Sequence, residues 1–200
     1  MDYFRYNGEA IDYLKARDSE LGRAIDRIGR IERGVIPDLF EALVSAIVAQ
    51  QISAKAAATV WGRVAERCAP ITPGHLATLP VEEIQGCGMS MRKAGYIRES
   101  ARTIEQGEVD LSALPALEDG QVIQRLSSLP GIGVWTAEML MIFSMQRPDV
   151  VSWGDLGIRR GMRILYGQDS LDRAQFDGYR RRYSPYGSVA SLYLWRIAVE

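Results

Sequence analysis

The chain has few of the side chains on which metal-dependent and thiol-dependent enzymes rely. Its 200 residues include two cysteines, Cys68 and Cys87, and one histidine, His75. Two thiols cannot hold an iron-sulfur cluster of four thiolates, and this set provides no four-ligand Cys/His zinc site. A single histidine, placed far from the motifs described below, also excludes a Ser/His/Asp nucleophile system. His75 follows Pro73 and Gly74, and we expect it in a surface loop.

Long apolar runs and a strong net charge are missing as well. No apolar run approaches the roughly 20 residues of a membrane-spanning helix, so we expect no membrane partner. Without a secretory signal, the two thiols are expected to be reduced, in the cytoplasm. The formal net charge of −1 argues against a uniformly basic nucleic-acid binder, although arginines gather at 159–163 and 180–182.

The composition predicts an all-α fold. Hydrophobic residues make up 47% of the chain, enough for a sizeable core. Helical apolar spacing recurs between short breaks rich in proline and glycine, and no segment alternates like a strand.

The segment 129–135 reads LPGIGVW and lies between two helical patterns, 121–126 and 135–143. Pro130 cannot continue a helix, while Gly131 and Gly133 permit a tight turn. Amides in such a turn, together with the start of the following helix, can bind a phosphate without a basic side chain. Taken alone, the pattern also fits a plain interhelical turn.

A second motif, WGDLGIRR at 153–160, contains Asp155 just before the helical run Leu156, Ile158, Met162 and Ile164. This placement predicts a helix N-cap, where backbone amides and the helix dipole stabilise an ionised carboxylate. The alternative is that Asp155 is a cap and nothing more.

Together these motifs resemble the helix-hairpin-helix DNA glycosylases. Residues Leu129, Pro130, Gly131, Ile132 and Gly133 match the DNA-backbone hairpin, and Asp155 lies where that superfamily keeps its catalytic aspartate. The chain is most similar to the 3-methyladenine DNA glycosylase II branch, with supporting segments at 47–57, 88–97 and 188–195, from about residue 38 to the end. The resemblance implies the two-lobed helical core, without the extra N-terminal α/β domain of larger relatives.

The resemblance also implies a lobe at about 38–130, a second formed by 1–37 and 131–200, and an active-site cleft between them in one 1–200 unit. Asp155 would stabilise an oxocarbenium-like sugar and orient the attacking water. Relatives that also break the strand carry a lysine two residues after the second hairpin glycine, where this chain has Trp135. Its only lysines are Lys15, Lys55 and Lys93, which predicts a monofunctional enzyme that leaves an abasic site.

A target base must leave the duplex to reach such a site. By resemblance Gln51 is the wedge that fills the gap, with Gln50 as its neighbour. They end an apolar run and precede Ser53, which predicts a corner between two helices; an exposed polar corner is the alternative. The base pocket is predicted from a set of aromatic and apolar residues, although a tryptophan at helical spacing is ordinarily core. They are Trp135, Trp195, Met139 and Trp153.

The expected partner is double-stranded DNA with a damaged base, bound by a monomer that is associated with the nucleoid when acting on DNA. No cofactor is required, but the resemblance allows Na⁺ or K⁺ on the backbone carbonyls of Ser127, Leu129 and Ile132. The expected reaction is release of 3-methyladenine and 7-methylguanine, which already carry positive charge. Glu138, Met139 and Gly187 depart from the related pattern, so action on mismatched or oxidised bases stays open, as does a non-catalytic DNA-binding module.

Overall fold

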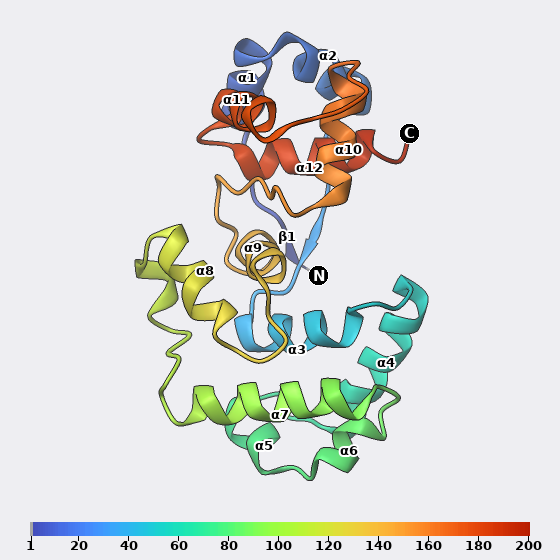
Figure 1. The fold of residues 1–200 in the computed structure, drawn as a ribbon, viewed down its shortest axis with the longest axis vertical. Coiled ribbons are helices and arrows are strands. Elements are labelled where there is room, and N and C mark those ends of the chain that lie inside the picture. Colours follow the sequence, from blue (N-terminus) through green and yellow to red (C-terminus); the bar gives the residue numbers. More distant parts are fainter. Residues whose placement is uncertain (1) are drawn as a thin grey trace. The chain divides into compact units, whose positions relative to one another are not determined.

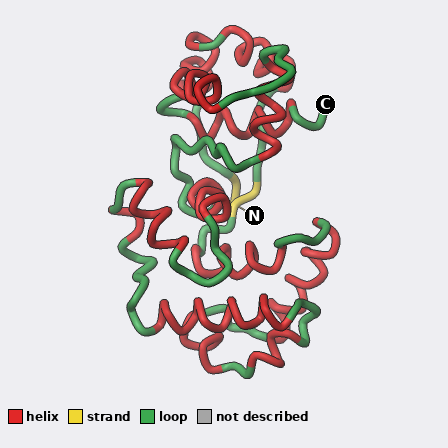
Figure 2. The backbone as a smooth tube through the Cα atoms, in the orientation of Figure 1, coloured by secondary structure: helices red, strands yellow, loops and turns green. Residues whose placement is uncertain are grey.

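The computed structural model describes residues 2–200, and helices form most of this part of the chain. Within it the only strands are β1 (Asp2–Tyr3) and β2 (Gly34–Val35), which pair antiparallel with Asp2 opposite Val35. Figure 2 shows this pair as the one short sheet among helices and loops. The all-α prediction is confirmed. No helix in residues 2–200 combines the length and the apolar character needed to cross a membrane.

Contacts divide the chain into two compact units. Unit 1 combines the chain up to Val35 with Met141–Glu200, and unit 2 is Ile36–Leu140. The second boundary falls inside α9 (Val134–Phe143), the helix that follows the hairpin. The predicted lobe bounds stay a prediction. The predicted cleft between two lobes stays a prediction.

Unit 1 is built around its last helix, α12 (Gly187–Ile197). This helix is buried along most of its length and packs on α10, α2 and α11 (Figure 1). A β-carbon added at Gly161 would lie 2.1 Å from the carbonyl oxygen of Leu194, so glycine permits the close approach of α10 and α12. The helices of this unit are α1 (Gly8–Arg17), α2 (Ser19–Ile28), α10 (Leu156–Leu165), α11 (Arg173–Tyr183) and α12 (Gly187–Ile197).

Unit 2 is organised around α7, which packs on α5, α6 and α3, while α3 also packs on α4. Besides the first turns of α9 and a 3₁₀ turn at Leu114–Ala116, its helices are α3 (Leu39–Ala49), α4 (Ala54–Arg67), α5 (Pro73–Thr78), α6 (Val81–Gln85), α7 (Met91–Glu105) and α8 (Asp119–Ser127).

The predicted loop at His75 is wrong. His75 lies in the first turn of α5, half-buried, because the Thr72 side chain caps that helix and Pro73 occupies its first position. Proline is tolerated there since the first amides of a helix have no intrahelical partner.

Candidate functional site

The glycine-rich turn joins α8 to α9 as predicted. Gly131 has a φ of +79°, and the Ile132 amide donates to the Leu129 carbonyl at 3.1 Å to close the turn. A β-carbon at Gly131 would lie 2.4 Å from the Tyr96 ring on α7, so a glycine is needed for both conformation and space. Leu129 and Ile132 are buried while Gly133 is exposed. The turn is therefore anchored by buried apolar side chains and is exposed to solvent at the start of α9.

The predicted corner between two helices is also confirmed. Gln50 ends α3, and the Ser53 hydroxyl caps α4 by accepting from the Ala56 amide at 3.2 Å. Between them Gln51 is exposed and has a φ of +57°. The Gln50 side-chain amide donates to the Gly131 carbonyl at 2.8 Å. Corner and hairpin are thus joined by a direct hydrogen bond within unit 2.

A contact that the sequence did not reveal holds the same corner from α7. The Lys93 ammonium donates to the carbonyl of Val48 at 2.9 Å and to that of Gln50 at 2.6 Å. Burial lowers the pKa of Lys93 below its ordinary value. The rarity of lysine in the chain was the one available signal, and it did not identify the partners, which lie more than 40 positions away.

Asp155 is the N-cap of α10, as its position predicted. Its side chain is buried, 7% exposed, and one oxygen, Oδ1, accepts from the Ile158 amide at 2.8 Å and from the Trp195 indole N–H at 2.9 Å. The other buried aspartate is Asp18, which caps α2 and receives the Tyr166 hydroxyl at 2.7 Å and Arg182 at 3.1 Å. Asp18 ties helices of unit 1 together, whereas Asp155 is oriented by an aromatic side chain that is itself a predicted site residue.

The Trp195 ring lies against the first turn of α10. Its centroid is 5.4 Å from that of Phe143, and a β-carbon at Gly157 would come within 2.8 Å of its Cδ1 atom. The lack of a side chain at Gly157 therefore lets the indole approach Asp155. Trp195 holds the carboxylate, and its predicted contact with a flipped base stays a prediction.

The other pocket candidates differ in their surroundings. Trp135, in the first turn of α9, is 46% exposed, and Met139 lies one turn further along the same helix, half-buried. Trp153 is instead surrounded within unit 1 by Phe176, with centroids 5.1 Å apart, and by two guanidinium groups. These belong to Arg159, 4.9 Å from its ring centroid, and Arg173, at 5.5 Å. The structure gives Trp153 a packing role, and its predicted contact with a base stays a prediction.

Asp149, the acid nearest in sequence to the motif, has a structural role. It accepts from the Ser184 hydroxyl at 2.5 Å and from the Gly187 amide at 3.1 Å. A β-carbon at Gly187 would lie 2.6 Å from Asp149 Oδ1 and 2.7 Å from Val151 Cγ2. A large side chain does not fit at residue 187 in this structure, which accounts for one departure from the related pattern.

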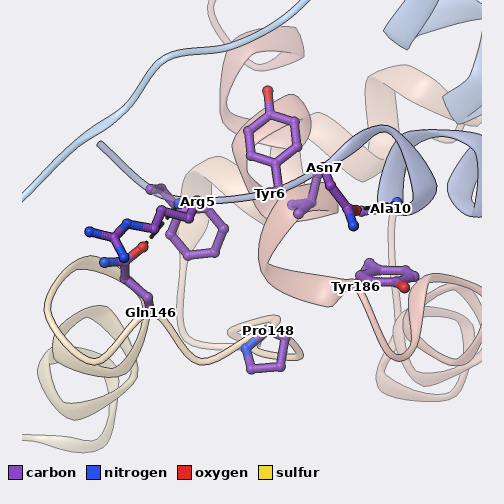
Figure 3. A pocket seen from close by; sticks show the side chains of 9 residues that line it. Arg5, Tyr6, Asn7, Ala10, Gln146, Pro148 and Tyr186 are labelled. Atoms are coloured by element: carbon purple, nitrogen blue, oxygen red, sulfur yellow. Dashed lines mark hydrogen bonds between the residues drawn. The ribbon is translucent and has the colours of Figure 1, made fainter. Parts of the chain in front are cut away.

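A separate pocket of about 450 Å³ lies in unit 1 and shares no residue with the predicted site. Figure 3 shows the Arg5 and Gln146 segments meeting at its edge, where the Arg5 amide donates to the Gln146 side chain at 2.9 Å. Its lining is Phe4, Arg5, Tyr6, Asn7, Ala10, Gln146, Pro148, Tyr186 and Val189.

Across residues 2–200, no three His, Cys, Asp or Glu side chains gather in a way that could hold a metal ion. The oxygen atoms predicted to bind a monovalent cation lie at the hairpin, and the Ser127 hydroxyl there is buried with no hydrogen-bond partner. A buried oxygen atom without a partner is the type of ligand that hard cations prefer.

The comparisons with known proteins agree with this architecture. A family model described as "HhH-GPD superfamily base excision DNA repair protein" matches residues 44–176. The DNA-3-methyladenine glycosylase 1 of Schizosaccharomyces pombe is 32% identical over 165 residues, which cover 78% of this chain and 71% of that protein. The chain belongs to the HhH-GPD superfamily of base excision DNA repair proteins.

Solved structures extend the match to nearly the whole chain. The DNA-3-methyladenine glycosidase of Bacillus halodurans superposes with a TM-score of 0.87 and 38% identity, covering 99% of this chain and 93% of that one. A 3-methyladenine DNA glycosylase of Schizosaccharomyces pombe in complex with abasic DNA gives a TM-score of 0.77 and 29% identity, covering 94% and 95%.

Proposed function

We propose that this protein is a monofunctional DNA glycosylase that removes alkylated purines from double-stranded DNA and leaves an abasic site. The observation that carries the proposal is Asp155, a buried helix cap oriented by Trp195 in a chain that also has the hairpin. Relatives named for 3-methyladenine support this substrate class. The protein acts as a monomer in the cytoplasm.

Asp155 acts through its charge. Cleavage of the N-glycosidic bond develops positive charge on the sugar, and a fixed carboxylate stabilises this charge and orients the water that attacks C1′. The departing 3-methyladenine or 7-methylguanine is already cationic and needs little protonation. The reaction therefore does not need a histidine as general acid. This agrees with the sequence, in which the single histidine, His75, lies far from Asp155.

The surroundings of the three lysines support hydrolysis without strand cleavage. Lys15 forms an ion pair with Asp26 on α2, Lys55 is exposed on α4, and Lys93 donates to two backbone carbonyls. Trp135 holds the position from which a lysine amine would attack the sugar. Water is then the nucleophile, and no Schiff base forms.

DNA is held by the hairpin at Leu129–Gly133 and opened by Gln51 at the corner, with Gln50 beside it. The amides at the start of α9 approach a backbone phosphate. A Na⁺ or K⁺ ion on the carbonyls of Ser127, Leu129 and Ile132 adds positive charge there, and no other cofactor is needed. By resemblance, the residues proposed to contact the flipped base are Trp135, Trp195, Met139 and Trp153.

Product analysis on methylated duplex DNA tests the proposal. Free bases are separated by chromatography, and strand breaks are scored with and without alkali, which cleaves abasic sites. We expect 3-methyladenine and 7-methylguanine release, alkali-dependent breaks only, and no covalent adduct on borohydride reduction. A trapped adduct would contradict the monofunctional mechanism. Release only from mismatched or oxidised duplexes would contradict the substrate class, and binding without release from any duplex would leave a DNA-binding module.

A further inference from the structure

Lys93 occupies a position that its own helix does not favour. It is the third residue of α7, whose first turn contains Arg92 and Lys93 and no acidic residue. The positive end of the helix dipole lies there, so a cation in that turn costs stability in α7. The reason for this lysine must come from what it contacts outside α7.

Those contacts lie at the end of α3. The carbonyls of Val48 and Gln50, both bound by Lys93, belong to the last turn and the C-cap of that helix, where carbonyls lack intrahelical partners. A cation stabilises the negative end of the helix dipole, and its N–H groups satisfy these orphan oxygens. Lys93 therefore stabilises the end of α3 that leads directly into Gln51.

Gln51 needs such support, because a left-handed backbone at a residue with a β-carbon costs about 1–2 kcal/mol. Strained residues persist where the surroundings fix them from several sides. Gln50, the residue before Gln51, is fixed twice: its carbonyl accepts from Lys93, and its side chain donates to the Gly131 carbonyl of the hairpin. On the other side of Gln51, Ser53 caps the next helix. The Gln51 side chain stays exposed at the tip.

We propose that Lys93 is a positioning residue for base flipping: its ammonium fixes the Val48 and Gln50 carbonyls so that Gln51 is presented to the duplex in its strained conformation. The role rests on the proposed glycosylase function. Lys93 acts through Gln51, so its removal slows base release from duplex DNA and has no further effect once the Gln51 side chain is gone. Affinity for undamaged duplex changes only by the loss of one charge.

A double-mutant cycle on the full chain tests this. Single-turnover release of 7-methylguanine from a duplex is measured for wild type, Lys93→Met, Gln51→Ala and the double variant. We expect Lys93→Met to slow release several-fold, up to the loss of about tenfold expected when the Gln51 side chain itself is removed, because a preorganised geometry is lost. The double variant should be no slower than Gln51→Ala. The fluorescence of a 2-aminopurine placed beside the lesion reports unstacking of the duplex, and its rise on binding should be smaller for Lys93→Met than for wild type.

Lys55→Met is the matched control, because it removes the same charge from the first turn of α4, where the side chain is exposed. It should match Lys93→Met in affinity for undamaged duplex and retain the wild-type release rate. If Lys93→Met does not fold, Lys93→Gln, which keeps an N–H donor, runs the same cycle. Rate losses that multiply in the double variant, or an equal rate loss in Lys55→Met, would overturn the positioning role.

Failure of the proposed function gives a different result. A wild-type protein that releases no base from any damaged duplex overturns that function and the positioning role with it. A wild-type protein that releases base, combined with multiplying losses in the cycle, overturns only the role of Lys93.

Discussion

The two interhelical turns of unit 2, the α3–α4 corner and the α8–α9 hairpin, differ in the type of residue at their left-handed position. Each contains one residue in the left-handed region, Gln51 at a φ of +57° and Gly131 at +79°. The glycine faces the Tyr96 ring with no space for a β-carbon, whereas the glutamine is exposed. At the hairpin, packing against Tyr96 requires a glycine at residue 131. At the corner, packing does not require a glutamine at residue 51.

The difference separates a structural requirement from a functional one. Glycine would adopt the corner conformation without strain, so a glutamine there keeps a side chain at a cost of about 1–2 kcal/mol. Strain of this kind is concentrated at functional sites. The corner thus agrees with a wedge that needs its side chain, and the hairpin with a backbone-binding turn that needs none.

Filling the hairpin should produce the largest loss of stability. Gly131→Ala combines a left-handed alanine with a collision against Tyr96, and we expect the free energy of unfolding to fall by about 2–5 kcal/mol. Gly107→Ala is the control, because Gly107 has a φ of +76° and nothing within 4 Å of the added carbon. It should lose only about 1–2 kcal/mol in urea unfolding. Equal losses would show that the Tyr96 contact does not explain the glycine.

Relaxing the corner should separate stability from activity. Gln51→Gly removes both the strain and the side chain, so the free energy of unfolding should stay within about 1 kcal/mol of wild type. Base release from duplex DNA should slow by about tenfold. Gln146→Gly, at the other non-glycine residue with a positive φ in residues 2–200, should leave release unchanged. A Gln51→Gly variant that releases base at the wild-type rate would contradict the wedge.

Alkaline pH should lower the free energy of unfolding more gently. Cys68 caps the end of α4, and its sulfur lies 3.7 Å from that of Cys87, in the turn before α7. Burial raises the pKa of the Cys68 thiol from 9.0 to about 11. The folded state therefore binds this proton more tightly, and the resulting stability is complete below pH 9 and is lost as the pH rises to about 11.

Urea unfolding from pH 8 to 11 measures this loss, and Cys68→Ala should reduce the slope. A slope that is the same in both proteins would contradict the assignment to Cys68.

Local patterns were sufficient to predict both turns and the Asp155 cap. Gly131, Ser53 and Asp155 each determine structure within a few residues, and the structure bears out the corner, the turn and the cap. The contacts that orient these turns were not predictable, because Lys93 reaches α3 and Trp195 reaches Asp155 across 40 or more positions. Packing of distant helices decides such pairs.

The errors also have physical causes. Pro73 and Gly74 led to the prediction of a loop at His75. Proline also fits the first turn of a helix, however, and Thr72 supplies the cap. The neighbours of Trp153 were also missed, because Arg159 and Arg173 come to lie beside its ring only when α10 and α11 are formed; its predicted place in the base pocket stays a prediction. The roles of Trp135, Met139 and Gln51 came from resemblance and await experiment.

The most direct test of the central claim is the single-turnover rate of base release from methylated duplex DNA by Asp155→Asn, with Asp149→Asn as control. Asparagine caps a helix as well as aspartate and keeps an acceptor for Trp195, so the fold should persist. The account predicts a loss of about 100-fold or more with duplex affinity retained, and little change for Asp149→Asn. Release by Asp155→Asn at close to the wild-type rate would contradict it.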